Sequence, residues 1–132
     1  MNTDNAYCAI IDYGMGNLFS VKNACEYVGL PSRVTNSIDE INDAGILILP
    51  GVGGFKDAMD SLNNLNLVDA ILKFSHSGKP IIGICLGMQL LFEKSCEFGQ
   101  HRGLGLIKGS VLKFDINLGL KVPHIGWNKI IK

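Results

Sequence analysis

One cysteine of this sequence stands in a setting typical of an enzymatic nucleophile. The run Gly83–Ile84–Cys85–Leu86–Gly87 joins an apolar, strand-like segment directly to a helical one and fits the G-x-nucleophile-x-G pattern, with Cys in place of Ser. A strand that enters a helix without a loop forces its central residue into a strained conformation, and small neighbours relieve the crowding. The sulfur then projects at the carboxyl edge of a sheet and at the positive end of a helix, where a thiolate is favoured. We therefore predict that Cys85 is a nucleophile and that the N–H of Leu86 binds an oxyanion.

Taken alone, this motif fits a buried cysteine at a strand end about equally well, because Gly and Cys are common there. Two further features favour the nucleophile. The loop Pro50–Gly51–Val52–Gly53–Gly54 follows another apolar run, and its glycines let backbone N–H groups approach a ligand and supply a second oxyanion donor. Gln89 lies one helical turn after Cys85, where a polar amide among apolar side chains is suited to contacting a substrate. A plain Gly-rich turn and an exposed helix position are the alternatives for these two features.

Composition excludes several classes of function. The chain has 132 residues, which fits one domain, and 47% of them are hydrophobic, which is enough for a core. Its formal net charge is +0, and it has no basic patch for nucleic acid or an anionic membrane. The N-terminus lacks the pattern of a secretion signal, and no apolar stretch is long enough to span a bilayer. We therefore expect a cytoplasmic protein.

The spacing of the four cysteines does not favour a metal or dithiol site. None belongs to a C-x-x-C pair, so we expect no metal, no cofactor and reduced thiols. Cys8 and Cys25 lie in apolar patterns and are predicted to be packing residues.

Short apolar runs alternate with helical segments along most of the chain. Continuous apolar strands separated by helices predict a mostly parallel sheet covered on both faces, that is, a three-layer α/β domain. Asn17 is the expected N-cap of the first helix. The expected strands are 7–11, 32–35, 46–49 and 80–84, and the expected helices are 17–27, 55–62, 67–74 and 86–94.

The pattern changes after Gly99. Residues 103–114 and 122–131 are β-like, contain several glycines, and have no helix between them. We expect them to extend the sheet with antiparallel strands. Because 127–132 still has a strand pattern, we expect the chain to end inside its fold, so that residues 1–132 form a domain whose C-terminal part is missing.

Several long motifs together resemble one enzyme family. The segment from Gly83 to Phe92 is similar to the nucleophile segment of class I, triad-type glutamine amidotransferases, and Pro50–Gly54 resembles the family's oxyanion strand. Three further segments resemble the glutaminase subunit of imidazole glycerol phosphate synthase. They are Asp12–Leu18, Gly103–Ile107 and Val122–Asn128, and the match spans nearly the whole chain.

This resemblance implies a role for each matched residue. Cys85 attacks the side-chain amide of glutamine and forms a glutamyl thioester. The backbone of Val52, Gly53 and Leu86 forms the oxyanion hole, and Gly51, Gly53 and Gln89 hold the glutamine.

The resemblance also implies a partner. Ammonia passes to a synthase (cyclase) subunit with a TIM-barrel fold, in a heterodimer that makes imidazole glycerol phosphate and aminoimidazole carboxamide ribotide for histidine biosynthesis. The residues that match interface segments are Tyr13, Asn17, Pro123, Ile125 and Trp127.

The sequence departs from the family at the catalytic base. The family has a His-x-Glu motif near the end of a longer domain, and none of His76, His101 and His124 stands in that context. We therefore expect this chain by itself to be inactive. Three alternatives stay open: a paralogue that supplies ammonia for amidating a bacterial surface sugar, a non-catalytic binding or scaffold subunit, and a cysteine hydrolase of the α/β-hydrolase type.

Overall fold

A computed structural model describes residues 6–119 and 121–131. Its main element is a parallel sheet with the strand order β2-β1-β3-β4. The strands are β1 (Cys8–Ile11), β2 (Ser32–Thr35), β3 (Ile46–Leu49) and β4 (Ile81–Gly83). In the register, Ile10 lies beside Ile48 of β3, and Ile48 lies beside Ile82 of β4. All four strands therefore end at the same edge of the sheet, which is the edge where Pro50 and Cys85 follow β3 and β4.

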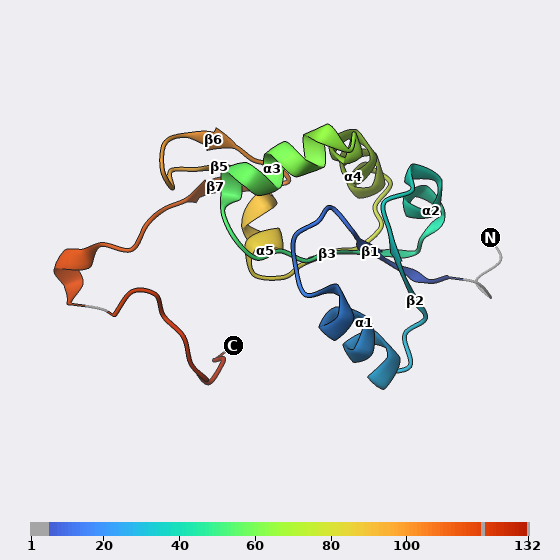
Figure 1. Cartoon of the computed structure of the whole chain (residues 1–132), viewed down its shortest axis with the longest axis horizontal. Coiled ribbons are helices and arrows are strands. Elements are labelled where there is room, and N and C mark those ends of the chain that lie inside the picture. Colours follow the sequence, from blue (N-terminus) through green and yellow to red (C-terminus); the bar gives the residue numbers. More distant parts are fainter. Residues whose placement is uncertain (1–5, 120, 132) are drawn as a thin grey trace.

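Helices cover both faces of this sheet (Figure 1). One face is covered by α1 (Leu18–Tyr27), and the other by α2 (Ile38–Asp43), α3 (Phe55–Asn64) and α4 (Leu67–His76). Each expected strand and each of the first three expected helices is found within a residue or two of its predicted bounds. The predicted three-layer α/β architecture is confirmed.

Two buried clusters follow from the alternation of side chains along the strands. Cys8, Ile10 and Ile48 face α1 and pack with Cys25 of that helix. Their sequence neighbours Ala9, Ile11, Leu47 and Leu49 face α3 and α4. Cys8 and Cys25 are thus packing residues, as predicted, and are 0% and 4% exposed.

Local signals fix the first helix. The Asn17 side chain accepts a hydrogen bond from the backbone N–H of Ser20 at 3.1 Å, which confirms the predicted N-cap. The chain leaves the helix through Gly29, whose φ of +72° suits glycine. The short helix α2 was not expected from the sequence.

The nucleophile segment differs from its prediction. The helix after Cys85, α5, covers Leu86–Leu90 only, whereas 86–94 was expected. Residues Phe92–Ser95 instead form strand β5, which pairs with β6 (His101–Arg102) and β7 (Ile107–Val111). The pairing with these strands stops the helix.

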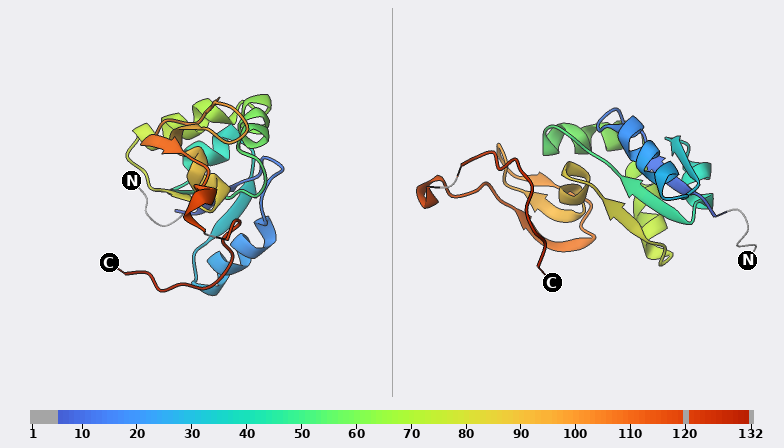
Figure 2. Two further views of the ribbon diagram at one scale, coloured as in Figure 1. Left: turned by 90° about the vertical axis from the view of Figure 1, so that its left-hand side faces the viewer. Right: turned by 90° about the horizontal axis from the view of Figure 1, so that it is seen from below.

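The distal prediction was wrong in two respects. The strands β6-β5-β7 form a second, separate sheet, in which β5 pairs with β6 antiparallel and with β7 parallel. Residues 122–131 contain no strand; they form an exposed, irregular segment that turns back after the 3₁₀ helix toward the rest of the molecule (Figure 2). Between β7 and this segment lies a short 3₁₀ helix, Ile116–Leu118. No helix in the described ranges is both long enough and apolar enough to cross a membrane.

Candidate active site

Cys85 lies in a strained turn between β4 and α5. Its φ is +53° and its ψ is −116°, a region that residues with a Cβ rarely adopt. Cys85 is exposed and stands at the carboxyl edge of the parallel sheet. The predicted strain at the central residue of the G-x-C-x-G motif is therefore present.

Both glycines of the motif are required by close packing. A Cβ on Gly83 would lie 2.5 Å from the Cα of Met88, so any side chain there would displace the first turn of α5. A Cβ on Gly87 would overlap the carbonyl oxygen of Leu49 and lie 2.7 Å from its carbonyl carbon. The helix that follows Cys85 thus packs its backbone directly on the end of β3.

The loop Pro50–Gly54 lies beside this turn. A Cβ on Gly51 would be 2.7 Å from the backbone nitrogen of Gly87, so the start of the loop touches the start of α5. Further along, Gly53 has a φ of +105°, which glycine adopts without strain, and Val52 is exposed. The predicted oxyanion donors Val52, Gly53 and Leu86 therefore belong to two backbone segments that meet next to Cys85.

Gln89 is partly buried on α5, one turn after Cys85. Its backbone N–H donates to the carbonyl of Cys85 at 3.2 Å. Its side-chain amide has no hydrogen-bond partner among residues 6–119 and 121–131, so this amide is free to bind a ligand.

Tyr13 and Asn17 have structural roles. Tyr13 is 1% exposed, and its hydroxyl donates a hydrogen bond to the carbonyl of Pro50 at 2.6 Å. Burial raises the pKa of this hydroxyl to about 12, so it stays protonated and remains a donor over the physiological range. Asn17 is exposed and caps α1. The burial of Tyr13 argues against direct contact of its side chain with a partner.

The other predicted interface residues lie far from any core. Pro123 is exposed, and Ile125 and Trp127 are 88% and 104% exposed in the segment that follows the second sheet. Trp127, the chain's single tryptophan, therefore does not fill a core.

The three histidines lie on other elements than Cys85. His76 ends α4, which precedes β4, so it lies toward the opposite edge of the sheet. His101 lies in β6 and bonds the carbonyl of Phe98, and His124 contacts Asn128 at 3.2 Å in the exposed segment. Within the part of the chain that the structure describes, no hydrogen bond joins a histidine to Cys85.

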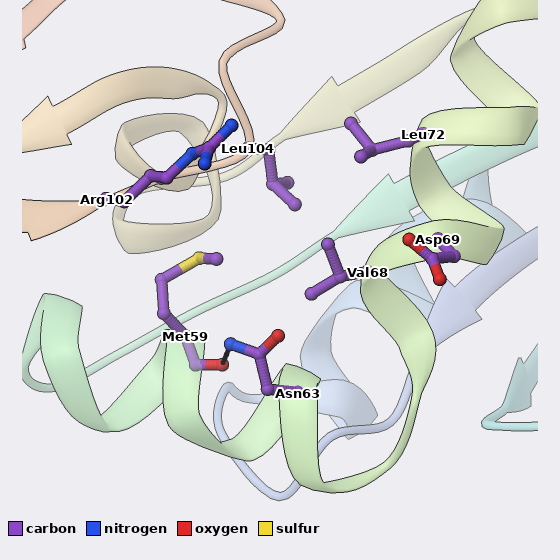
Figure 3. Close-up of a pocket in the computed structure, with 8 residues that line it drawn as sticks. Met59, Asn63, Val68, Asp69, Leu72, Arg102 and Leu104 are labelled. Atoms are coloured by element: carbon purple, nitrogen blue, oxygen red, sulfur yellow. Dashed lines mark hydrogen bonds between the residues drawn. The ribbon is translucent and has the colours of Figure 1, made fainter.

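One cavity lies away from the predicted site residues (Figure 3). A cavity of about 320 Å³ lies between α3, α4 and the loop after β6. Its lining includes Met59, Val68, Leu72 and Arg102, and none of the predicted site residues. The backbone geometry around Cys85, and not this cavity, therefore defines the candidate site.

Comparison with known proteins identifies the family. The sequence profile of the glutamine amidotransferase class-I family matches residues 9–132. The chain belongs to this family. The crystal structure of a glutamine amidotransferase shares its fold, with a TM-score of 0.67 at 18% identity, over 79% of this chain and 55% of that one.

Similar amidotransferase sequences carry a more specific name. The chain is 56% identical over 122 residues to the imidazole glycerol phosphate synthase subunit HisH of Aquifex aeolicus, covering 92% of this chain and 58% of that protein. It is 53% identical over 125 residues to the HisH subunit of Sulfurimonas denitrificans, covering 92% of this chain and 60% of that protein. The chain thus spans about 60% of the length of these relatives.

Proposed function

We propose that this chain is a glutaminase subunit of imidazole glycerol phosphate synthase. The observation that carries the proposal is the strained Cys85 turn, packed against the Gly51 loop, in a chain 56% identical to a HisH subunit. Residues 1–132 hold the nucleophile, the oxyanion donors and Gln89 of a glutamine amidotransferase type-1 domain.

In the proposed reaction, the Cys85 thiolate attacks the side-chain carbonyl carbon of glutamine. An S–C bond forms, and the carbonyl oxygen becomes an oxyanion that the backbone N–H groups of Leu86 and of Val52 or Gly53 stabilise. The C–N bond then breaks, and the nitrogen takes up a proton and leaves as ammonia. Water hydrolyses the glutamyl thioester to glutamate and regenerates the thiol.

Substrate binding rests on the groups next to the sulfur. The free amide of Gln89 and the backbone of Gly51 and Gly53 are suited to hold the polar groups of glutamine. The ammonia passes to a TIM-barrel synthase subunit, which uses it to make imidazole glycerol phosphate and aminoimidazole carboxamide ribotide in the cytoplasm. The exposed Pro123, Ile125 and Trp127 are proposed to contact that subunit, together with the turn that precedes Asn17.

The acylation step can be tested directly. Incubate the chain with glutamine, quench in acid, and analyse the Cys85 peptide by mass spectrometry. A glutamyl adduct that forms in the wild type and is absent from Cys85→Ser supports the proposal. If neither glutamine nor a γ-glutamyl aryl ester forms an adduct on Cys85, the proposed chemistry is wrong.

The partner needs a separate test. The synthase subunit of Aquifex aeolicus is a suitable probe, since the HisH subunit of that organism is 56% identical. Binding measured by calorimetry supports the histidine-pathway assignment. Binding only to the synthase of a surface-sugar amidation system would contradict this assignment and support the paralogous function.

A further inference from the structure

A buried tyrosine holds the peptide from which the oxyanion loop begins. The hydroxyl of Tyr13 donates to the carbonyl of Pro50 at 2.6 Å, across 37 positions of sequence. Within residues 6–119 and 121–131, this hydroxyl is the only hydrogen-bond donor to that carbonyl. The Pro50–Gly51 peptide is planar, so fixing its carbonyl also fixes the direction of the Gly51 N–H at the entry to the loop.

The tyrosine itself is held firmly. Its side chain is 1% exposed, within the core cluster between the sheet and α3. Its backbone carbonyl accepts a hydrogen bond from the hydroxyl of Ser61 on α3. The ring therefore has little freedom, and its hydroxyl is a fixed support for the loop.

The rest of the turn after β1 also packs closely against the loop Pro50–Gly54. A Cβ on Gly16 would lie 3.1 Å from the Cβ of Pro50, and a Cβ on Gly53 would lie 2.9 Å from the Cε of Met15. At Gly51, a Cβ would meet the Tyr13 hydroxyl and the backbone nitrogen of Gly87 at the same distance, 2.7 Å. The tyrosine hydroxyl thus reaches the point where the loop meets the nucleophile turn.

We propose that Tyr13 is a positioning residue for the oxyanion hole: its hydroxyl holds the Pro50–Gly51 peptide so that the loop N–H groups stay directed at the space above Cys85. It does not touch the substrate, and it acts through the backbone of Gly51–Gly53. The inference rests on the proposed function, because it assigns the loop as part of an oxyanion hole.

Two electrophiles that react with Cys85 distinguish a loss of oxyanion-hole positioning from a general loss of structure at the site. A γ-glutamyl 4-nitrophenyl ester reacts by attack of the Cys85 sulfur on a carbonyl: an S–C bond forms through an oxyanion, the C–O bond breaks, and nitrophenolate leaves. Iodoacetamide reacts by displacement at a saturated carbon, with iodide leaving and no oxyanion. Loss of the oxyanion hole lowers the first rate and leaves the second unchanged.

The variant is Tyr13→Phe, and Tyr7→Phe is its matched control. Tyr7 also donates its hydroxyl to a backbone carbonyl, that of Glu40, at 2.5 Å, but it lies near α2 and away from the loop. We expect Tyr13→Phe to lower the rate of acylation at least tenfold and to change the rate of alkylation less than twofold. Tyr7→Phe should change neither rate by more than twofold. Equal loss of both rates in Tyr13→Phe, or loss of neither, overturns the inference.

A second measurement does not depend on the chemistry. The NMR order parameters of the backbone N–H groups of Gly51, Val52 and Gly53 should be lower in Tyr13→Phe than in the wild type, and unchanged in Tyr7→Phe. Unchanged order parameters in the loop of Tyr13→Phe overturn the positioning role, whatever the acylation result. A wild type that is alkylated but never acylated, with lower loop order parameters in Tyr13→Phe, instead contradicts the proposed function and leaves the tyrosine–loop coupling established.

Discussion

The four cysteines of this chain occupy very different surroundings. Cys8 and Cys25 are buried between β1 and α1, whereas Cys85 and Cys96 are exposed. Burial, together with the neighbouring Cys25, raises the pKa of Cys8 to about 12, so its thiol is protonated at neutral pH. Because the thiolate is the nucleophile, reactivity should be confined to the two exposed sulfurs, of which only Cys85 stands at a strained strand-to-helix turn.

Limiting iodoacetamide at neutral pH should therefore label Cys85 first. The measurement is peptide mapping of the folded chain after partial alkylation, with the extent of labelling compared across the four sites. Cys96 is the internal control for exposure without the strained turn. Faster labelling of Cys96, or any early labelling of Cys8 or Cys25, would remove the support for Cys85 as nucleophile.

Much of the residue-scale site was predictable because it depends on local chain geometry. The G-x-C-x-G motif specifies a tight turn, and the structure has the positive φ at Cys85 and the close approaches at Gly83 and Gly87 that such a turn requires. The role of Tyr13 was not predictable in this way. Its hydrogen bond to Pro50 joins residues 37 positions apart, and no local sequence pattern predicts such a contact.

At the scale of elements, the same distinction explains which predictions succeeded. The strands β1 and β3 and the helix α1 were found from continuous apolar runs and from an N-cap, which are local signals. The helix α2 has only six residues, too few for periodicity, although Ser37 followed by Asp39 and Glu40 could have suggested a helix start.

Helix α2 was missed, whereas helix α5 was predicted to be longer than it is. Residues 86–94 have the composition of one helix, but the segment from Phe92 on pairs with β6 and β7. Ladder hydrogen bonds to residues 101–111 outweigh a local helix preference that is worth less than about 1 kcal/mol per residue. The prediction of a strand at 122–131 was wrong for a related reason: a local apolar pattern does not show whether a strand is available to pair with. In the described chain, this segment has no neighbouring strand.

The contact between α5 and β3 gives an element-scale prediction. Gly87→Ala places a Cβ onto the carbonyl of Leu49, which is backbone and cannot move aside cheaply. We expect a loss of stability of about 1–3 kcal/mol, from overpacking, and a changed rate of alkylation at Cys85 as the turn shifts.

The measurements are urea unfolding and iodoacetamide kinetics. Gly126→Ala is the matched control, because a Cβ at Gly126 meets nothing within 4 Å. A Gly87→Ala protein with wild-type stability and wild-type alkylation kinetics would show that the nucleophile turn does not depend on this close approach.

At the scale of the whole molecule, the nucleophile and the three histidines lie on different elements. Cys85 stands at the carboxyl edge of the first sheet, and His76, His101 and His124 lie on α4, on β6 and in the exposed segment. None belongs to a His-x-Glu pair. A cysteine amidotransferase needs a base that relays a proton to the leaving ammonia.

The 132-residue chain alone should therefore show very slow glutaminase turnover. General acid–base assistance contributes about 10²–10⁴-fold, so we expect release of glutamate to fall below that of the Aquifex aeolicus HisH subunit by at least such a factor. The assay is glutamate release with and without the synthase subunit. Rapid turnover that Cys85→Ser abolishes would mean that one of the three histidines reaches Cys85, and His124→Ala would be the first variant to examine.

The exposed C-terminal segment concentrates large apolar side chains in one place. Ile125, Trp127, Ile130 and Ile131 are each at least 88% exposed, so none of them belongs to a core. Because four large apolar side chains of this one short segment are so exposed, we propose the segment as an interaction site. Tryptophan is also among the residues that most often dominate binding energy.

Trp127→Ala should therefore weaken capture of the synthase subunit without destabilising the chain. A buried Trp→Ala costs about 3–5 kcal/mol, but a side chain 104% exposed has no packing to lose, so the melting temperature should stay within about a degree of the wild type. Binding should weaken at least tenfold, since an anchor tryptophan contributes about 2 kcal/mol or more. Tyr27→Ala is the matched control, because Tyr27 is 92% exposed on α1 and is not among the predicted interface residues, so it should affect neither quantity. Calorimetric titration with the synthase and thermal unfolding provide the two readouts. If Trp127→Ala binds as tightly as the wild type, or if Tyr27→Ala weakens binding as much, the segment from Val122 to Asn128 is not the anchor, and the interface must be sought on another face of the first sheet and its helices.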